Sequence, residues 1–381
     1  MKAWLLLVSL LWAAPAPAAP VRVEAAPESA PSGGERPLPL RTVGRVGTIE
    51  EPGGTVRHVH QWPGVYFETT FTGGRLSIGF DDPDNEYRLL VDDQAPVALK
   101  PRGRAWCRVT GLAAGPHRVR LEKVTESVDY RGAFLGFHAP EGSKPGALGG
   151  PTRRIEFIGD SSMTGYGNRS ATRQCTKDEV RDTTDTQQAY PALAAKAAGA
   201  DYQVNAISGR GLVRNYEGTL PGHAMADVYP RLFFQGDETY DFAGWKPQIV
   251  VIKLNADFFA PLRPDEAWPS LPSLAEAYIA RFEAFVAELH RRSPGAALLI
   301  WWPDPATLTD PGHAAMAKMG RDRIAAAAAA AGVRHIDFLA PGGPPFEIAA
   351  CDYHLTLADH RRLAAWFSAY LLQHPEYWDG N

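Results

Sequence analysis

The stretch RIEFIGDSSMTGYGN, residues 154–168, decides the fold of this chain. Its first part is apolar and β-prone, and Gly159 permits a sharp turn where a Cβ would crowd the backbone. We therefore expect a short strand that stops at a Gly-Asp-Ser turn and leaves Ser161 at the carboxyl end of the strand. Open α/β sheets bind their ligands at this end. Gly-Asp-Ser alone is weak evidence, because Asp and Ser are also ordinary turn and N-cap residues.

From residue 153 to the C-terminus, strand-like runs alternate with helical ones. Alternation of this kind predicts a parallel sheet with helices on both faces. Strands are expected at 154–158, 202–206, 248–254, 296–302 and 333–338. Helices are expected at 186–198, at 273–291 with a Ser-x-x-Glu capping box at its start, at 312–331 before Gly332, and at 356–372 with Thr356 as N-cap and Asp359 three residues on. We predict a flavodoxin-like, doubly wound α/β domain over residues 153–381.

Residues 41–140 contain short β-prone runs broken by turn signals such as Gly73-Gly74. Such spacing predicts an antiparallel β-sandwich, which we expect to be a jelly roll. The Gly/Pro-rich residues 141–152 are expected to be the linker between the two domains. An acidic turn at residues 81–86 has oxygen ligands for calcium, but it lacks the Gly and the distal Glu of an EF-hand loop, so an ordinary polar turn is favoured.

The N-terminal residues 1–19 have the features of a secretory signal peptide. They contain one Lys, an apolar run too short to span a bilayer comfortably, and small residues that fit an A-x-A cleavage site. Residues 20–40, rich in Ala, Pro, Gly and Glu, are expected to form a disordered linker. No later apolar stretch is long enough to span a membrane, so we expect a secreted or periplasmic protein. The net charge of -4 gives no reason to expect nucleic acid or an anionic membrane as a partner.

Three cysteines, Cys107, Cys175 and Cys351, allow at most one intramolecular disulfide. Cys175 follows the Gly-Asp-Ser segment and Cys351 precedes His354, so these two could pair, although sequence alone leaves the connectivity open. No Cys-x-x-Cys motif or Cys/His cluster indicates zinc. We expect neither a metal nor a cofactor.

Four segments, in this order, resemble the SGNH (GDSL-type) hydrolase superfamily. Within it they are similar to the two-domain carbohydrate esterase family 2, which removes acetyl groups from plant cell-wall sugars. The segments are IEFIGDSSMTGYGN at 155–168, NAISGRGLVRNY at 205–216, PQIVVIKLNADFF at 247–259 and CDYHLTLADH at 351–360. The resemblance implies a serine esterase, with a small β-domain before the catalytic domain, that acts on acetylated xylan, mannan or glucomannan.

An ester hydrolase needs a nucleophile, a base and donors aimed at the oxyanion. The resemblance makes Ser161 the nucleophile, because the family uses the Ser directly after Asp, and it makes His354 the base. Asp352 is assigned as a supporting residue, since the family is taken to work with a Ser-His dyad whose His is held by a backbone carbonyl. The backbone N–H groups of Ser161 and Gly209 are the expected oxyanion donors, and Gly211 lies close enough to be confused with Gly209.

The third oxyanion donor departs from the family pattern. Family members read Gly-x-Asn-Asp after the third strand, whereas this chain reads Asn255-Ala256-Asp257-Phe258. Ungapped alignment puts Asp257 where Asn is expected, and an ionised Asp257 would repel the developing negative charge. Either Asp257 is protonated, or Asn255 substitutes for it with a shifted loop, or the enzyme is impaired.

Polar and aromatic residues near the predicted strand ends are candidates for a sugar-binding cleft. They are Tyr166, Asn215, Tyr216, Trp301 and Trp302. Trp302 is favoured for stacking on a pyranose, and the alternative is that Trp301 and Trp302 only cap the core. Two other functions stay open: an SGNH lipase or acylhydrolase of other esters, which a deep apolar acyl pocket would favour, and a catalytically impaired carbohydrate-binding homologue, which Asp257 suggests.

Overall fold

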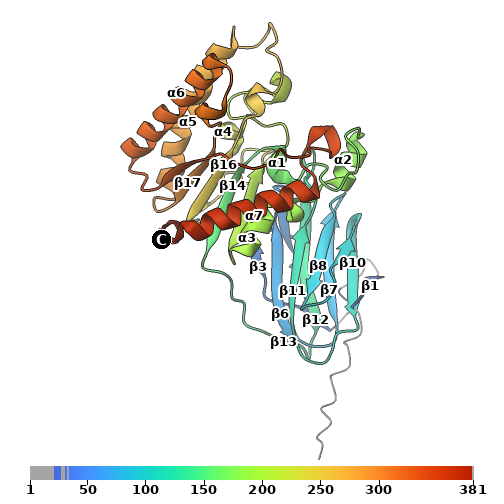
Figure 1. The fold of residues 1–381 in the computed structure, drawn as a ribbon. Helices are drawn as coiled ribbons and strands as arrows, with labels where there is room; N and C mark the ends of the chain where they lie inside the picture. Colours follow the sequence, from blue (N-terminus) through green and yellow to red (C-terminus); the bar gives the residue numbers. More distant parts are fainter. Residues whose placement is uncertain (1–20, 27–30, 32–33, 380–381) are drawn as a thin grey trace, which may run out of the picture.

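The computed structural model describes residues 21–26, 31 and 34–379. The predicted signal peptide, residues 1–19, lies outside them. An all-β domain comes first along the chain and an α/β domain follows it (Figure 1). None of the helices among the described residues is both long and apolar enough to cross a membrane.

The N-terminal domain is a sandwich of two antiparallel sheets, as the short β-prone runs predict. One sheet has the order β1-β10-β7-β12-β5-β4 with β2 paired to β12, and the other has the order β13-β6-β11-β8-β9 with β3 paired to β6. Strand β8 buries every second residue, so its apolar side chains face the core between the sheets. The strands are β1 (Arg22–Ala26), β2 (Glu35–Pro37), β3 (Arg41–Val43), β4 (Val46–Glu50), β5 (Val56–His60), β6 (Tyr66–Thr72), β7 (Leu76–Asp82), β8 (Tyr87–Val91), β9 (Val97–Leu99), β10 (Gly103–Thr110), β11 (Pro116–Lys123), β12 (Gly132–Pro140) and β13 (Lys144–Pro145).

Both segments that were expected to be linkers contribute strands to this sandwich. β1 and β2 lie within residues 20–40 and pair with β10 and β12, and β13 lies within residues 141–152 and pairs with β6. The prediction of a disordered linker is therefore wrong for β1 and β2, and β13 is a short strand within the expected interdomain linker. Val21 and Val23 pack against the sandwich core, so this short apolar alternation outweighs the Pro- and Gly-rich composition around it.

The C-terminal domain is built on a parallel sheet of order β15-β14-β16-β17-β18. Counted from the first strand of the domain, this is the order 2-1-3-4-5, so the predicted flavodoxin-like, doubly wound fold is confirmed. The strand order reverses around β14, which is the strand that carries the Gly-Asp-Ser turn. The strands are β14 (Arg154–Gly159), β15 (Asp201–Ala206), β16 (Ile249–Lys253), β17 (Ala297–Trp301) and β18 (Ile336–Leu339).

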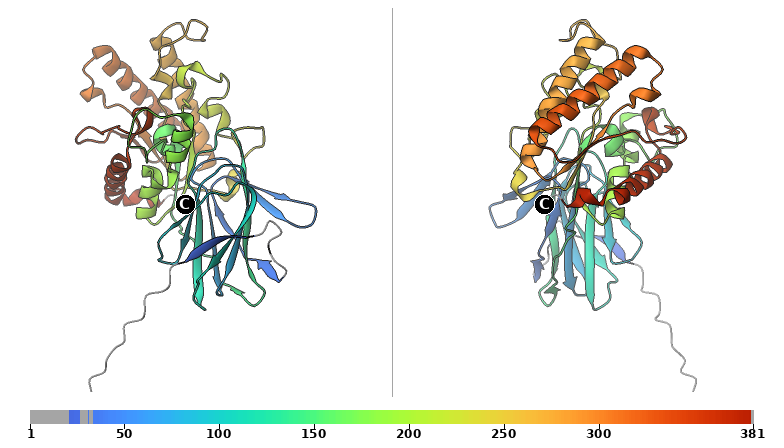
Figure 2. Two further views of the ribbon diagram at one scale, coloured as in Figure 1. Left: turned by 90° about the vertical axis from the view of Figure 1, so that its right-hand side faces the viewer. Right: turned by 60° about the vertical axis from the view of Figure 1, so that its left-hand side comes forward.

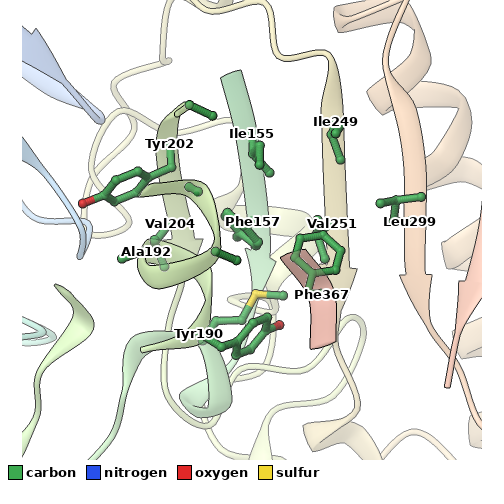
Figure 3. Packing of buried hydrophobic residues seen from close by; sticks show 14 of the residues in the cluster. Ile155, Phe157, Tyr190, Ala192, Tyr202, Val204, Ile249, Val251, Leu299 and Phe367 are labelled. Carbon is green, nitrogen blue, oxygen red and sulfur yellow. The ribbon is translucent and has the colours of Figure 1, made fainter. Parts of the chain in front are cut away.

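Helices cover both faces of this sheet, α3 and α7 on one side and α5 and α6 on the other (Figure 2). Phe157 of β14 packs with Phe367 of α7 on the first face (Figure 3). On the second face, Ile252 of β16 belongs to the same core cluster as Phe282 of α5. The α-helices are α1 (Ser161–Thr164), α2 (Lys177–Thr183), α3 (Tyr190–Ala197), α4 (Met225–Val228), α5 (Leu271–Arg292), α6 (Pro311–Ala331) and α7 (Leu357–Gln373). Single 3-10 turns are η1 (Thr186–Gln188), η2 (Tyr216–Gly218), η3 (Phe242–Gly244), η4 (Ala256–Phe258), η5 (Pro305–Thr307), η6 (Cys351–Tyr353) and η7 (Pro375–Trp378).

The helix ends follow the predicted capping signals with one exception. Thr356 caps α7 in a reciprocal box with Asp359, and Gly332 ends α6 in the left-handed conformation. The exception is α5, whose N-cap is Ser270 and not Ser273. Because α7 begins three residues after His354, its capped first turn fixes the backbone that carries this histidine.

The acidic turn at residues 81–86 is held by protein donors. Asp82 accepts hydrogen bonds from the backbone of Asp84 and Asn85 and from the Tyr87 hydroxyl. Within the part of the chain that the structure describes, no group of three or more His, Cys, Asp or Glu side chains is arranged to hold a metal ion. The polar-turn interpretation therefore accounts for this segment.

Candidate active site

The Gly-Asp-Ser turn joins β14 directly to the short helix α1. Asp160 caps this helix, since its Oδ1 accepts hydrogen bonds from the Ser162 N–H (3.0 Å) and the Ser162 hydroxyl (2.8 Å). A Cβ on Gly159 would lie 2.9 Å from the backbone carbonyl oxygen of Lys253 and 2.4 Å from the Met163 sulfur, so a larger residue would force the turn to shift. Ser161 is left partly exposed at the point where the strand order reverses, which is where doubly wound sheets bind their ligands.

His354 lies against Ser161. Its Nε2 is 2.7 Å from Ser161 Oγ, and its Nδ1 lies 2.9 Å from the carbonyl oxygen of Cys351 and 3.1 Å from that of Asp352. Because carbonyls only accept hydrogen bonds, Nδ1 carries the proton and the Nε2 lone pair faces the serine. Burial lowers the pKa of His354, so the imidazole stays neutral to a lower pH than an exposed histidine. Such an imidazole can take the proton of the Ser161 hydroxyl.

The carboxylate of Asp352 does not touch His354. Its Oδ2 accepts a hydrogen bond from the Tyr166 hydroxyl at 2.8 Å. The Tyr166 ring in turn lies against the imidazole, with 4.3 Å between the ring centroids. Asp352 therefore supports His354 in two ways, through its own backbone carbonyl and through Tyr166, and the geometry is that of a dyad and not of a carboxylate triad.

A disulfide joins Cys175 to Cys351, the pairing that the sequence left open. It ties the segment after α1 to η6, whose carbonyl groups hold His354. Gly167 packs directly on this bridge, because a Cβ there would lie 2.4 Å from Cys351 Cβ. Cys107 is a free, partly buried thiol in the β-sandwich.

Two backbone N–H groups are free beside the serine. Across the described ranges, neither the Ser161 N–H nor the Gly209 N–H donates a hydrogen bond to the protein, and both residues are partly exposed. Gly209 follows β15, the strand next to β14, and it adopts a φ of 75°, which glycine tolerates without strain. Thr164 Oγ1 lies 3.1 Å from Ser208 Oγ, so the Gly209 turn contacts the Ser161 helix. Free N–H groups of this kind suit an anionic oxygen.

Asp257 lies in a different setting from the one that the alignment predicts. Both of its carboxylate oxygens are buried and accept hydrogen bonds, each of 2.8 Å, from the backbone N–H groups of Leu212, Val213 and Arg214. Burial raises the pKa of Asp257 to about 6, against the lowering effect of these donors. The prediction that Asp257 faces the oxyanion is therefore corrected: its carboxylate organises the loop after Gly209.

The same loop explains the second glycine of the segment NAISGRGLVRNY. A Cβ on Gly211 would lie 2.3 Å from Asp257 Oδ2 and 2.1 Å from the Arg214 carbonyl oxygen. The buried Arg214 then donates to the Asp257 carbonyl (2.9 Å) and pairs with Glu266. Gly211 is thus a packing glycine, which separates it from Gly209.

Asn255 remains as the side chain near the serine. Gly159 of β14 pairs in register with Lys253 of β16, so Ser161 and Asn255 each stand two residues beyond paired positions at the same sheet edge. Asn255 is exposed, and its Oδ1 lies 3.4 Å from Lys253 Nζ. The amide nitrogen is left without a protein acceptor among the described residues.

The predicted sugar-binding residues divide into two groups. Tyr166 and Tyr216 lie at the site, and the N–H of Tyr216 donates to the Gly209 carbonyl at 2.8 Å. Asn215 is buried and its amide donates to the carbonyls of the turn that follows it. It therefore shapes the loop, and its side chain is too buried to offer sugar a surface in this structure.

The two tryptophans pack into the two cores of the α/β domain. Trp302 donates from Nε1 to the Ala317 carbonyl at 2.8 Å, and its ring fills the space beside Gly320. Trp301 packs on Tyr190 and Trp366 under α3 and α7. Both side chains are partly buried, and their contacts favour the alternative that they cap the core over the predicted stacking of Trp302 on a pyranose.

Sequence reasoning missed two residues at this site. Tyr353 is 67% exposed beside His354, and its left-handed backbone (φ 61°) presents the ring outward. An aromatic residue next to the predicted base was the signal for it. Glu126, from the β-domain, accepts hydrogen bonds from the Ser208 N–H (2.7 Å) and hydroxyl (2.5 Å), and 82 residues of separation leave no sequence signal for this contact.

A serine hydroxyl bonded to an imidazole, directly after a Gly-Asp-Ser turn and at the switch point of a flavodoxin-like sheet, defines a GDSL-type hydrolase. The family described as GDSL-like Lipase/Acylhydrolase matches residues 157–362. The family described as Carbohydrate esterase 2 N-terminal matches residues 42–147, the β-sandwich. The chain therefore belongs to carbohydrate esterase family 2 and is a carboxylic ester hydrolase.

Similar proteins agree over almost the whole length. An acetylxylan esterase / glucomannan deacetylase of Cellvibrio japonicus (strain Ueda107) is 39% identical over 345 residues, which are 90% of this chain and 93% of the relative. A solved carbohydrate esterase, described as having an active site with divergent catalytic and non-catalytic binding functions, is 37% identical with a TM-score of 0.81 and covers 90% of this chain and 100% of its own. A carbohydrate esterase family 2 enzyme of Corynascus thermopiles (Myceliophthora fergusii), solved with a carbohydrate binding domain, is 28% identical with a TM-score of 0.68 and covers 88% of this chain and 99% of its own.

Proposed function

We propose that the chain is a secreted serine esterase that removes O-acetyl groups from xylan, mannan or glucomannan, as polysaccharide or oligosaccharide. The observation that carries the proposal is the 2.7 Å hydrogen bond between His354 Nε2 and Ser161 Oγ, with Nδ1 held by two carbonyls. The substrate class follows the acetylxylan esterase / glucomannan deacetylase to which this chain is 39% identical.

The reaction proceeds in two acyl-transfer steps. His354 Nε2 takes the Ser161 proton while Oγ attacks the acetyl carbonyl, and the same proton then passes to the departing sugar oxygen. Water, deprotonated by His354, attacks the acetyl-Ser161 ester. The bond between the acetyl carbon and Ser161 Oγ then breaks, acetate leaves, and His354 returns the proton to Oγ. The carbonyls of Cys351 and Asp352 stabilise the imidazolium that forms in each step, which is the task that a carboxylate performs in a triad.

The oxyanion is bound by three donors in this scheme. They are the N–H groups of Ser161 and Gly209 and the side-chain amide of Asn255, whose oxygen is engaged by Lys253. This assignment replaces Asp257 and removes the observation that suggested a catalytically impaired, carbohydrate-binding homologue.

Exposed tyrosines are the proposed sugar contacts. Tyr353 is 67% exposed beside the base, and Tyr216 is 44% exposed next to Gly209. An aromatic face can stack on a pyranose, and a phenol can also form a hydrogen bond with it. Tyr166 is proposed to contact substrate only with the part of its ring that His354 leaves open.

Secretion is supported by an independent chemical observation. The disulfide between Cys175 and Cys351 is of the kind that persists outside the reducing cytosol. It agrees with the signal peptide expected at residues 1–19.

Acetate release tests the proposal directly. Wild-type protein is expected to release acetate from 4-nitrophenyl acetate and from acetylated xylan and mannan, and Ser161→Ala should lose at least about 1000-fold in kcat. Ser162→Ala is the matched control, because the Ser162 hydroxyl donates to Asp160, its one partner within residues 21–26, 31 and 34–379, and should be largely dispensable. Wild-type release no higher than that of Ser161→Ala would refute the esterase, and a preference for 4-nitrophenyl butyrate over the acetate would favour an acylhydrolase of other esters.

A further inference from the structure

The structure assigns Glu126, a residue of the N-terminal β-domain, as a positioning residue for the oxyanion donors of the α/β domain. Glu126 lies in the segment that follows β11. The inference rests on the proposed esterase function and names a component of the same site. It makes the β-sandwich a part of the catalytic apparatus and not only a neighbouring domain.

The first step is that Glu126 forms two hydrogen bonds with Ser208. One carboxylate oxygen accepts the Ser208 N–H at 2.7 Å and the other accepts the Ser208 hydroxyl at 2.5 Å. Burial raises the pKa of Glu126, and the two hydrogen bonds from Ser208 act against this rise. Two hydrogen bonds to the two oxygens of one carboxyl group fix both the position and the orientation of Ser208. Ser208 immediately precedes Gly209, so these two bonds fix the residue from which the peptide unit with the free Gly209 N–H begins.

The second step is that hydrogen bonds connect Ser208 to α1, the helix that begins at Ser161. The carboxylate is an acceptor only, so the Ser208 hydroxyl donates to Glu126 and its oxygen can accept from Thr164, 3.1 Å away. Thr164 belongs to α1, and its hydroxyl also lies 3.2 Å from the Ser161 carbonyl oxygen, so its single proton serves one of these two acceptors at a time. Ser208 and Thr164 thus connect the Glu126 carboxylate to α1, the helix that begins at Ser161.

The third step concerns how the β-domain holds Glu126 in place. Val124 accepts a hydrogen bond from the Thr186 N–H at 2.9 Å, and Lys123 accepts one from the Gln187 amide at 3.0 Å. The end of β11 is thus anchored on η1 of the α/β domain, only a few residues before Glu126. An anchored segment can hold a neighbouring loop to the fraction of an ångström that transition-state contacts require.

The test separates positioning from stability. Glu126→Ala is expected to lower kcat for 4-nitrophenyl acetate by about 100-fold with KM changed less than about threefold, because the donors are misplaced and substrate binding is not. Glu126→Gln keeps an acceptor for the Ser208 N–H and should recover at least about tenfold of this loss. Asp129→Ala is the matched control, since Asp129 is an exposed carboxylate of the same segment and should behave as wild type.

Two further measurements keep the test decisive. Ser208→Ala removes the hydroxyl link while the Glu126 side chain remains, so it must lower kcat even where Glu126→Ala does not fold. The rate at which a fluorophosphonate modifies Ser161 depends on the same donors, and it should fall in parallel whether or not the protein hydrolyses acetylated sugars. Failure of acetate release in wild type would thus refute the proposed function alone. An unchanged kcat and labelling rate in the folded Glu126 and Ser208 variants, or losses that only follow the folded fraction, would overturn the positioning role.

Discussion

At the scale of single residues, the proposed oxyanion hole exchanges the roles of Asp257 and Asn255. The alignment placed Asp257 at the position of an oxyanion donor. Its carboxylate is instead fully buried and accepts hydrogen bonds from three backbone N–H groups. An asparagine side chain at this position would accept through one oxygen only, and its NH2 group would face a backbone N–H. The two oxygens of a carboxylate accept from all three backbone N–H groups. Asp257 is therefore required for the loop, and Asn255 is free for the chemistry.

Substitutions at Asn255 and at Asp257 test this exchange of roles. Asn255→Ala should lower kcat by about 100- to 1000-fold with little change in thermal stability, because the side chain is exposed and donates only to the oxyanion. Asp257→Asn should instead lower the free energy of unfolding by about 1–3 kcal/mol, because buried donors lose their acceptor. Steady-state kinetics and urea unfolding give the two quantities, with Asp237→Asn as the exposed control. A rise in turnover for Asp257→Asn would contradict the exchange and restore the impaired-enzyme reading.

At the scale of elements, η6 and the disulfide together position His354. The bridge fixes Cys351, and the carbonyls of Cys351 and Asp352 fix Nδ1. We expect a variant with Cys175→Ser and Cys351→Ser to lose about 2–5 kcal/mol of stability, because the bridge closes a long loop across 176 positions. Its kcat should fall as well, since the Nδ1 acceptors then belong to an untethered turn.

Thermal unfolding and kcat, measured on the double variant and on Cys107→Ser, check this expectation. Cys107 is free and lies in the β-sandwich, so its replacement should leave kcat unchanged. A double variant with wild-type kcat across the temperatures at which it is folded would show that η6 holds His354 without the bridge.

Elements are also the scale at which sequence reasoning was most reliable. β16 and β17 contain continuous apolar runs, and strand-like runs alternate with helical ones along the domain, so β14 to β18 were predicted within a few residues and their order with them. Ser161 and His354 were predicted because the segments that carry them resemble the SGNH hydrolase motifs, in order and at turns that precede helices. The contacts of Asp257 and Glu126 were not predictable, since they depend on where loops from distant segments meet, and β1 was masked by the Pro- and Gly-rich residues around it.

At the scale of the whole molecule, a buried arginine unites the two domains. Arg45, between β3 and β4, has no exposed surface and reaches into the α/β domain, where it donates to the Arg231 carbonyl at 2.9 Å. Its guanidinium lies 3.6 Å from the buried carboxylate of Glu156 and within 5 Å of the ring centres of Trp62 and Tyr229. The β-domain therefore supplies the positive charge that compensates a carboxylate on β14, the strand that ends at the nucleophile turn.

The consequence is that the domains should unfold together. Arg45→Met keeps much of the volume but leaves Glu156 without a cation, and we expect it to lower the free energy of unfolding by about 3–5 kcal/mol. Arg36→Met removes the exposed pair with Glu141 and should cost about 1 kcal/mol or less. Urea unfolding followed by far-UV circular dichroism and by tryptophan fluorescence should give one shared transition in wild type, and both probes should shift together in Arg45→Met. A shift confined to one probe would mean that each domain is stable without the other. The position of Glu126 at the active site would then depend on how the two folded domains dock, and not on their folding as one unit.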